Sequence, residues 1–168
     1  MKNIRARNIA PWITLVAAAG AFALEPSGFV PPEFLVGPQV TRAASGNTYS
    51  FTGRAPHPDA RLQFTRVEIP SRAPAHDGVF CARAFLNEVG SHATGFFVQP
   101  DRTALTLAGI TFATYRWTGR LAGDATTGIV ACGVTGEHYV AITFQDALPR
   151  AARSFPAIRA RLSRLVFK

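Results

Sequence analysis

The sequence contains few of the residue patterns that mark an enzyme. Its 168 residues include no Gly-x-Ser-x-Gly, Ser-x-x-Lys or His-Glu-x-x-His pattern, and no glycine-rich segment that follows a strand and opens a helix to bind phosphate. Zinc sites generally need cysteine and histidine pairs at set spacing, and no such pairs occur. These absences predict no catalytic residues, no metal site and no cofactor.

Cysteine is scarce: the chain has two, Cys81 and Cys132. An even number in an exported protein favours a disulfide, and a pair of buried free thiols is the alternative. Closing a loop of about 50 residues would stabilise the fold by about 4 kcal/mol. Both cysteines lie in segments whose pattern predicts strands, one of them residues 79–86 (VFCARAFL).

Long hydrophobic runs are also missing, because the apolar run at residues 12–22 is shorter than the roughly 20 residues that span a bilayer. A basic start precedes this run, and the small residues Ala21 and Ala23 end it. That order is typical of a secretory signal peptide. We expect residues 1–23 to be removed, leaving a periplasmic or secreted protein without a transmembrane helix. An uncleaved signal that tethers the domain to a membrane is the alternative.

The remaining chain suits one domain. Residues 24–47 hold four prolines and three glycines without periodicity, which predicts an irregular N-terminal arm. Residues 48–168 are predicted to form a single α+β domain, in which a C-terminal amphipathic helix packs on an antiparallel sheet of about six or seven strands. In the best-defined hairpin, a turn at Gly136 joins two strands. The predicted strand segments are 48–52, 61–69, 79–86, 94–99, 105–118, 127–134 and 138–144.

The last segment changes period and predicts a helix over residues 147–166. Its apolar residues fall within an arc of about 140° at 100° per residue. Asp146 is a natural N-cap, Pro149 is tolerated in the first turn, and Pro156 should kink the helix or divide it in two. Arg159 lies near the edge of the apolar arc, where its aliphatic stem would cover the core.

Charge is concentrated in this last segment. The formal net charge is +8, and residues 146–168 carry six basic residues against one acid. The helix face opposite the apolar arc carries Arg150, Arg153, Arg161 and Arg164. Like charges repel mildly unless something anionic meets them, so this face is a candidate contact for an anionic surface or an unknown envelope protein. Nucleic acid is not the expected partner, and an ordinary solvated face is the alternative.

Two aromatic residues and two histidines are further candidates for binding. Tyr115 and Trp117 share one face of a predicted strand, where they could stack on a sugar or peptide if exposed, or fill the core if buried. His57 and His76 lie beside carboxylates in proline-rich loops, a pattern that ordinary loop polarity explains better than a metal site does.

The back half of the chain resembles the PsbP-like superfamily. The resemblance rests on a long strand that ends in Arg-Trp-Thr-Gly at residues 116–119, on the hairpin 128–144, and on a closing helical segment 155–167 that leads into a short strand. Residues 49–51 are similar to the family's first strand. The resemblance implies an antiparallel sheet flanked by helices and a non-enzymatic binding or assembly role.

These observations together predict an exported, non-enzymatic binding or assembly protein of the cell envelope, which contacts a partner through its basic C-terminal helix. The alternative is a small periplasmic enzyme or ligand-binding module that uses the aromatic pair or the histidine loops.

Overall fold

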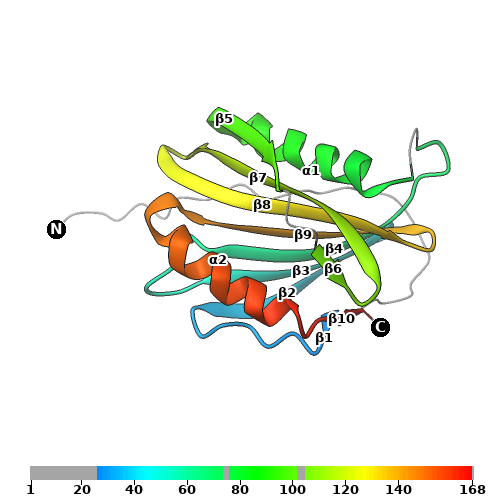
Figure 1. Ribbon diagram of the computed structural model, residues 1–168, viewed down its shortest axis with the longest axis horizontal. Helices are drawn as coiled ribbons and strands as arrows, with labels where there is room; N and C mark the ends of the chain where they lie inside the picture. The colour runs from blue at the N-terminus through cyan, green and yellow to red at the C-terminus, as the bar shows by residue number, and fades with distance from the viewer. Residues whose placement is uncertain (1–25, 74–75, 102–104, 168) are drawn as a thin grey trace.

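An eight-stranded antiparallel sheet forms the centre of the fold (Figure 1). The computed structural model describes residues 26–73, 76–101 and 105–167. The strands lie in the order β2-β3-β4-β9-β8-β7-β5, and β6 pairs with β7. Their bounds are β2 (Leu35–Ala43), β3 (Gly46–Gly53), β4 (Arg61–Glu68), β5 (Ala93–Pro100), β6 (Leu105–Leu107), β7 (Ile110–Leu121), β8 (Asp124–Thr135) and β9 (His138–Ala147).

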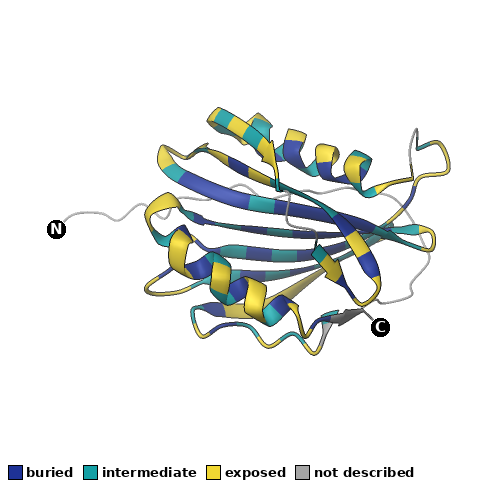
Figure 2. Ribbon diagram, viewed as in Figure 1, coloured by how far each residue is buried: buried dark blue, intermediate teal, exposed yellow. Residues whose placement is uncertain are grey.

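The hairpin of β8 and β9 lies in the middle of the sheet and is buried on both faces (Figure 2). A tight turn at Gly136, whose φ is +55°, joins the strands and confirms the predicted hairpin. Side chains alternate across the pleat, so Ile142 and Phe144 face one side while Tyr139 and Ala141 face the other. The sheet therefore has a separate hydrophobic core on each face.

Helix α2 (Leu148–Leu162) covers one face of the sheet and packs on β8 and β9. Pro149 lies in its first turn as predicted, and Pro156 does not divide the helix. The predicted N-cap is wrong, because the helix begins after Ala147 without a side-chain cap. Asp146 lies in β9, and its side chain is fully buried. The buried residues of α2 are Ala151, Ser154, Ile158 and Leu162, of which the last two join the core formed with β3, β4 and β9.

Helix α1 (Gly78–His92) covers the opposite face, where a strand was predicted over residues 79–86. The side chain of Asp77 caps the helix by accepting a hydrogen bond from the backbone N–H of Phe80 at 2.7 Å. An eight-residue apolar window fits both the strand and the helix period, and only the longer segment distinguishes them. The residues that α1 buries recur at helical spacing: Cys81, Ala82, Leu86 and Val89.

Part of the N-terminal arm is a strand and not irregular as predicted. β2 pairs with β3 at the edge of the sheet, and its register shifts between Val36 and Gln39, on either side of Pro38. An edge strand tolerates proline because one side of the strand needs no hydrogen-bond donor. The irregular register also leaves Pro38 outside the regular pairing with β3. Phe29 also fastens this region, since its ring lies 5.4 Å from that of Phe51.

The two ends of the described chain meet. β1 (Pro26–Ser27) pairs with β10 (Val166–Phe167) in a separate two-stranded sheet (Figure 1). A short strand thus follows the C-terminal helix, as the resemblance implies. Within the described ranges, neither helix is long and apolar enough to cross a membrane. The predicted signal peptide, residues 1–23, lies outside the described residues.

The architecture is α+β, as predicted, but the number of strands and the number of helices both exceed the prediction. The main sheet has eight strands instead of six or seven, and a second helix lies on its other face. The proline-rich arm contributes β2, and the predicted strand 105–118 divides into β6 and β7 at a turn of Ala108 and Gly109, whose φ angles are positive. The additional helix, α1, replaces the predicted strand 79–86.

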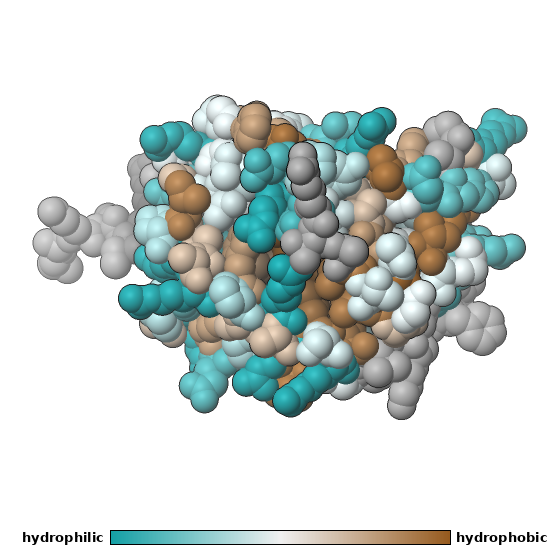
Figure 3. Space-filling view, viewed as in Figure 1, coloured by the Kyte–Doolittle hydropathy of each residue, from teal (hydrophilic) through white to brown (hydrophobic). Residues whose placement is uncertain are grey.

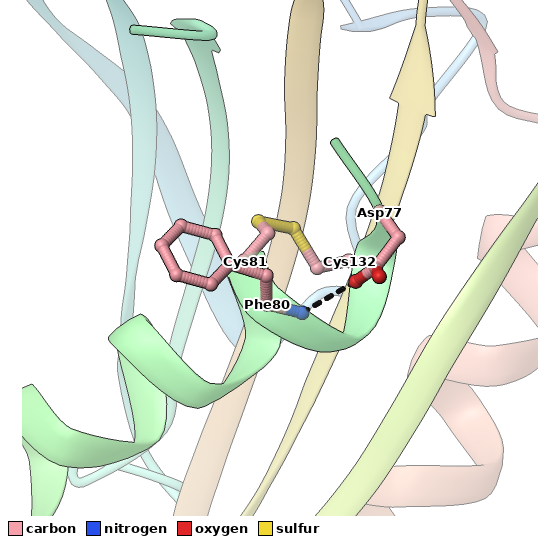
Figure 4. Close-up of a disulfide and its surroundings, with 4 residues drawn as sticks. All are labelled: Asp77, Phe80, Cys81 and Cys132. Carbon is pink, nitrogen blue, oxygen red and sulfur yellow. Dashed lines mark hydrogen bonds between the residues drawn. A yellow bond between two sulfur atoms is a disulfide. The ribbon is translucent and has the colours of Figure 1, made fainter. Parts of the chain in front are cut away.

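A disulfide joins Cys81 of α1 to Cys132 of β8, which confirms the predicted pairing (Figure 4). Both cysteines are buried, at 3% and 0% exposure, and their Cα atoms lie 6.0 Å apart. Figure 4 shows the bond one turn along from the Asp77 cap, so the start of α1 is held covalently and by its cap.

We predict that replacing Cys81 and Cys132 together by alanine lowers the free energy of unfolding by about 4 kcal/mol, because the cross-link limits the unfolded chain. Urea unfolding of the oxidised, reduced and double-alanine proteins measures this loss. Reduced and double-alanine proteins should agree closely, and an oxidised protein no more stable than either would contradict the prediction.

Candidate functional site

A groove of about 570 Å³ lies between α2 and the part of the sheet that α2 leaves uncovered. One wall is α2, and the floor is formed by β7 and β8, with Leu105 of β6 at one side. Its volume lies within the roughly 300–1,000 Å³ of small-molecule sites. On the face where α2 lies, Figure 3 shows brown apolar side chains beside teal hydrophilic ones.

One row of side chains crosses three strands of the sheet, and its β8 and β7 members lie on the groove floor. Phe144 of β9 pairs with Ile129 of β8, and Ile129 pairs with Arg116 of β7. The ring of Phe155 on α2 lies 5.1 Å from that of Phe144, so the helix covers the β9 end of this row. Ile129 and Arg116 lie beyond the helix and line the groove.

Two guanidinium groups make the groove amphipathic. The Nε of Arg116 donates to the carboxylate of Asp101 at 3.0 Å, and Asp101 also lines the groove. Arg159 is exposed and lines the α2 wall. No acidic partner of Arg159 occurs within residues 26–73, 76–101 and 105–167. The apolar lining consists chiefly of Leu105, Ile129, Leu148, Phe155 and Leu162.

None of the four arginines predicted as a contact face lines the groove. Arg150, Arg153 and Arg161 lie on the flank of α2 that turns away from it. The helix predicted over residues 147–166 ends at Leu162, so Arg164 lies in the turn that follows. Arg150 forms an ion pair with Asp59 of the loop between β3 and β4. The other three, of which Arg153 and Arg164 are exposed and Arg161 is half-buried, have no acidic partner in the described part of the chain.

The aromatic pair lies on the other face of the sheet, under α1. Trp117 is 2% exposed and stacks on Phe96 at 5.8 Å, while Tyr115 is half-buried against the same core. A Cβ atom at Gly128 would lie 2.5 Å from the indole ring, so the strand packs directly on the tryptophan. The structure thus places Trp117 as core filling, the alternative that the sequence left open.

His57 forms a buried pair with Asp146, 89 residues further along the chain. Its Nδ1 lies 2.7 Å from Oδ2 of Asp146, and the other carboxylate oxygen accepts the backbone N–H of Ala147 at 2.8 Å. The imidazole also packs on the ring of Phe34, with centroids 4.5 Å apart. This pair ties the β3–β4 loop to the start of α2, and neither residue lines the groove.

The other histidines lie on three different elements. His76 is exposed before α1, and His92 pairs with Glu88 at 3.2 Å on the surface of that helix. His138 accepts a hydrogen bond from Arg66 at 3.0 Å. Burial, together with the positive charge of Arg66, lowers the pKa of His138. Burial also lowers the pKa of Arg66 and raises that of Tyr139.

Sequence reasoning did not identify the groove residues as a group. Strand alternation places Arg116 opposite Tyr115 and Trp117, hence on the α2 face, and helical spacing places Arg159 on one flank of α2. Both signals are present in the sequence. Only the packing of α2 across β8 and β9 brings the two arginines to one groove.

Comparisons with known proteins show the fold alone. No family model and no curated protein matches the chain. Among solved structures, the chain is similar to a protein of unknown function, PA94 from Pseudomonas aeruginosa. The two are 13% identical with a TM-score of 0.52, over 81% of this chain and 88% of that one.

A second solved structure, of LpqN from Mycobacterium tuberculosis, has a TM-score of 0.48 at 12% identity. The match covers 83% of this chain and 82% of that one, and LpqN is described as involved in cell envelope biogenesis. The resemblance to the PsbP-like superfamily stays a prediction.

We predict that Asp146→Ala destabilises the protein by about 3–5 kcal/mol, because it leaves His57 and the N–H of Ala147 without their partner in a buried site. Asp59→Ala is the matched control: it removes an exposed partner of Arg150 and should cost less than about 1 kcal/mol. Urea unfolding measures both, and equal losses would contradict the role assigned to the buried pair.

Proposed function

We propose that the protein is an exported, non-enzymatic binding protein of the cell envelope that holds an apolar or amphipathic ligand in the groove beside α2. The observation that carries the proposal is the groove itself: about 570 Å³ of partly open space in the side of a 168-residue chain, lined mainly by aliphatic and aromatic side chains. Apolar grooves with a few polar groups at defined places are the usual form of a small-molecule site.

The position of the His57–Asp146 pair supports binding rather than catalysis. A histidine whose ring is hydrogen-bonded to a buried carboxylate can act as a general base. To do so, its other ring nitrogen would have to face the ligand. His57 is 7% exposed, its ring is covered by Phe34, and it does not line the groove. Its contacts instead fasten a loop to the helix that forms the groove wall.

The disulfide supports the exported location, because such bonds persist in oxidising compartments. It also supports a preformed site. By holding α1 against β8 from the opposite face, it limits movement of the strand whose Ile129 lies on the groove floor. A rigid floor reduces the ordering cost of binding.

The arginine flank of α2 provides a second contact surface in this proposal. Arg153, Arg161 and Arg164 face outward without acidic partners in the described chain, and an anionic envelope component would neutralise them. The groove lies on the flank of α2 opposite Arg153 and Arg161, and Arg164 follows the end of the helix. Variants on each flank therefore separate the two contacts.

We predict that the mature protein binds the uncharged fluorescent probe N-phenyl-1-naphthylamine saturably, with one site. Ala152→Trp should reduce this binding at least tenfold, because Ala152 is exposed on the groove wall and a tryptophan there fills the space. Ala160→Trp is the matched control, since Ala160 is exposed on α2 but does not line the groove.

The probe is titrated with each protein, and its emission is measured after direct excitation of the probe. Circular dichroism verifies that each variant is folded. No saturable binding by the native protein, or equal binding by both tryptophan variants, would overturn the groove as the ligand site.

A further inference from the structure

We propose that the groove ligand is a long-chain carboxylate, with its aliphatic tail on the groove floor and its head group at Arg159. This inference rests on the proposed function, because it names the chemical class of ligand for the same groove. It follows from the charge of the groove, the position of that charge and the nature of the remaining lining.

The described lining residues carry one net positive charge. The charged residues among them are Asp101, Arg116 and Arg159, and Asp101 neutralises Arg116 through the 3.0 Å contact. The positive charge of the Arg159 guanidinium is therefore not balanced by a lining residue. A single negative charge on the ligand balances the groove, whereas a dianion would leave an excess negative charge beside Asp101. A carboxylate also matches the planar fork of donors that arginine presents.

The charge lies at the rim and the apolar surface lies inside. Arg159 and Arg116 are exposed, whereas Leu162 is buried and Ile129 and Phe155 are half-buried. A ligand that satisfies both regions has one anionic end and an apolar body that extends away from it. A compact anion would leave Ile129 of the floor and Phe155 of the α2 wall uncovered.

The shape of the groove favours a single chain. Its α2 wall extends from Leu148 to Leu162, the whole length of the helix, and Ile129 of β8 and Arg116 of β7 lie on the floor beside it. An unbranched aliphatic tail lies along such a wall and contacts both the sheet and the helix. Each methylene that enters the groove should then tighten binding about three- to fourfold until the groove is full.

The experiment compares carboxylates with alcohols of the same length. Octanoate, decanoate and dodecanoate, and the three matching alcohols, compete with N-phenyl-1-naphthylamine for the mature native protein, below their micellar concentrations and at two salt concentrations. We expect dodecanoate to bind most tightly, and each carboxylate to bind about fivefold more tightly than its alcohol at low salt. The carboxylate preference should shrink at high salt.

Variants assign the preference to one side chain. Arg159→Gln should weaken carboxylate binding more than alcohol binding, and so remove the carboxylate preference. Arg153→Gln is the matched control on the same helix, because Arg153 is exposed but does not line the groove.

The outcomes separate this inference from the proposed function. Equal affinity for dodecanoate and dodecanol, or an equal effect of Arg159→Gln on both, overturns the carboxylate while the groove remains a binding site. Tighter binding of an acidic peptide than of dodecanoate, in the same competition, overturns the single-chain ligand. Failure of every compound, the uncharged probe included, overturns the proposed function itself.

Discussion

Burial of the β8–β9 hairpin on both faces is the constraint on which the rest of the structure depends. Because successive side chains point to opposite sides of a strand, Val130 and Cys132 join one core while Ile129 and Ala131 join the other. Each core needs a cover, and α1 and α2 provide one on each face. The disulfide and the Asp77 cap fasten the first helix, and the His57–Asp146 pair lies at the start of the second.

The groove is a consequence of the sizes of the elements. A helix about 10–12 Å wide covers roughly two strands that lie about 4.8 Å apart. α2 lies on β8 and β9, so Thr114 and Arg116 on the same face of β7 remain uncovered beside it, whereas Ile110 and Phe112 of that face are buried in the core. Arg116 and the partly exposed Ile129 are therefore open to a ligand, while α1 covers Trp117 on the opposite face.

Sequence patterns predicted those elements whose signal is long and local. The hairpin at Gly136 has a turn signal between two alternating segments, and the helix beginning at Leu148 has a sustained apolar arc. Prediction was wrong where the signal was short. The segment VFCARAFL alternates over eight residues and also fits the period of a helix. The Asp77 cap favours the helix, but its hydrogen bond to Phe80 forms only once the helix has formed. β2 was missed because its prolines and glycines oppose strand formation, whereas pairing with β3 at the sheet edge supports it.

The sequence by itself determined the α+β class, the central hairpin, the amphipathic C-terminal helix and the concentration of positive charge upon it. It also contained the cysteine pair, although not the fact that the bond joins a helix to a strand. Tertiary structure alone decided which side chains meet. Arg116 and Arg159 reach one groove, and His57 reaches Asp146 across 89 residues, because the sheet brings distant segments together. Periodicity specifies which way a side chain points, but the neighbour it finds there depends on the packing of the whole chain.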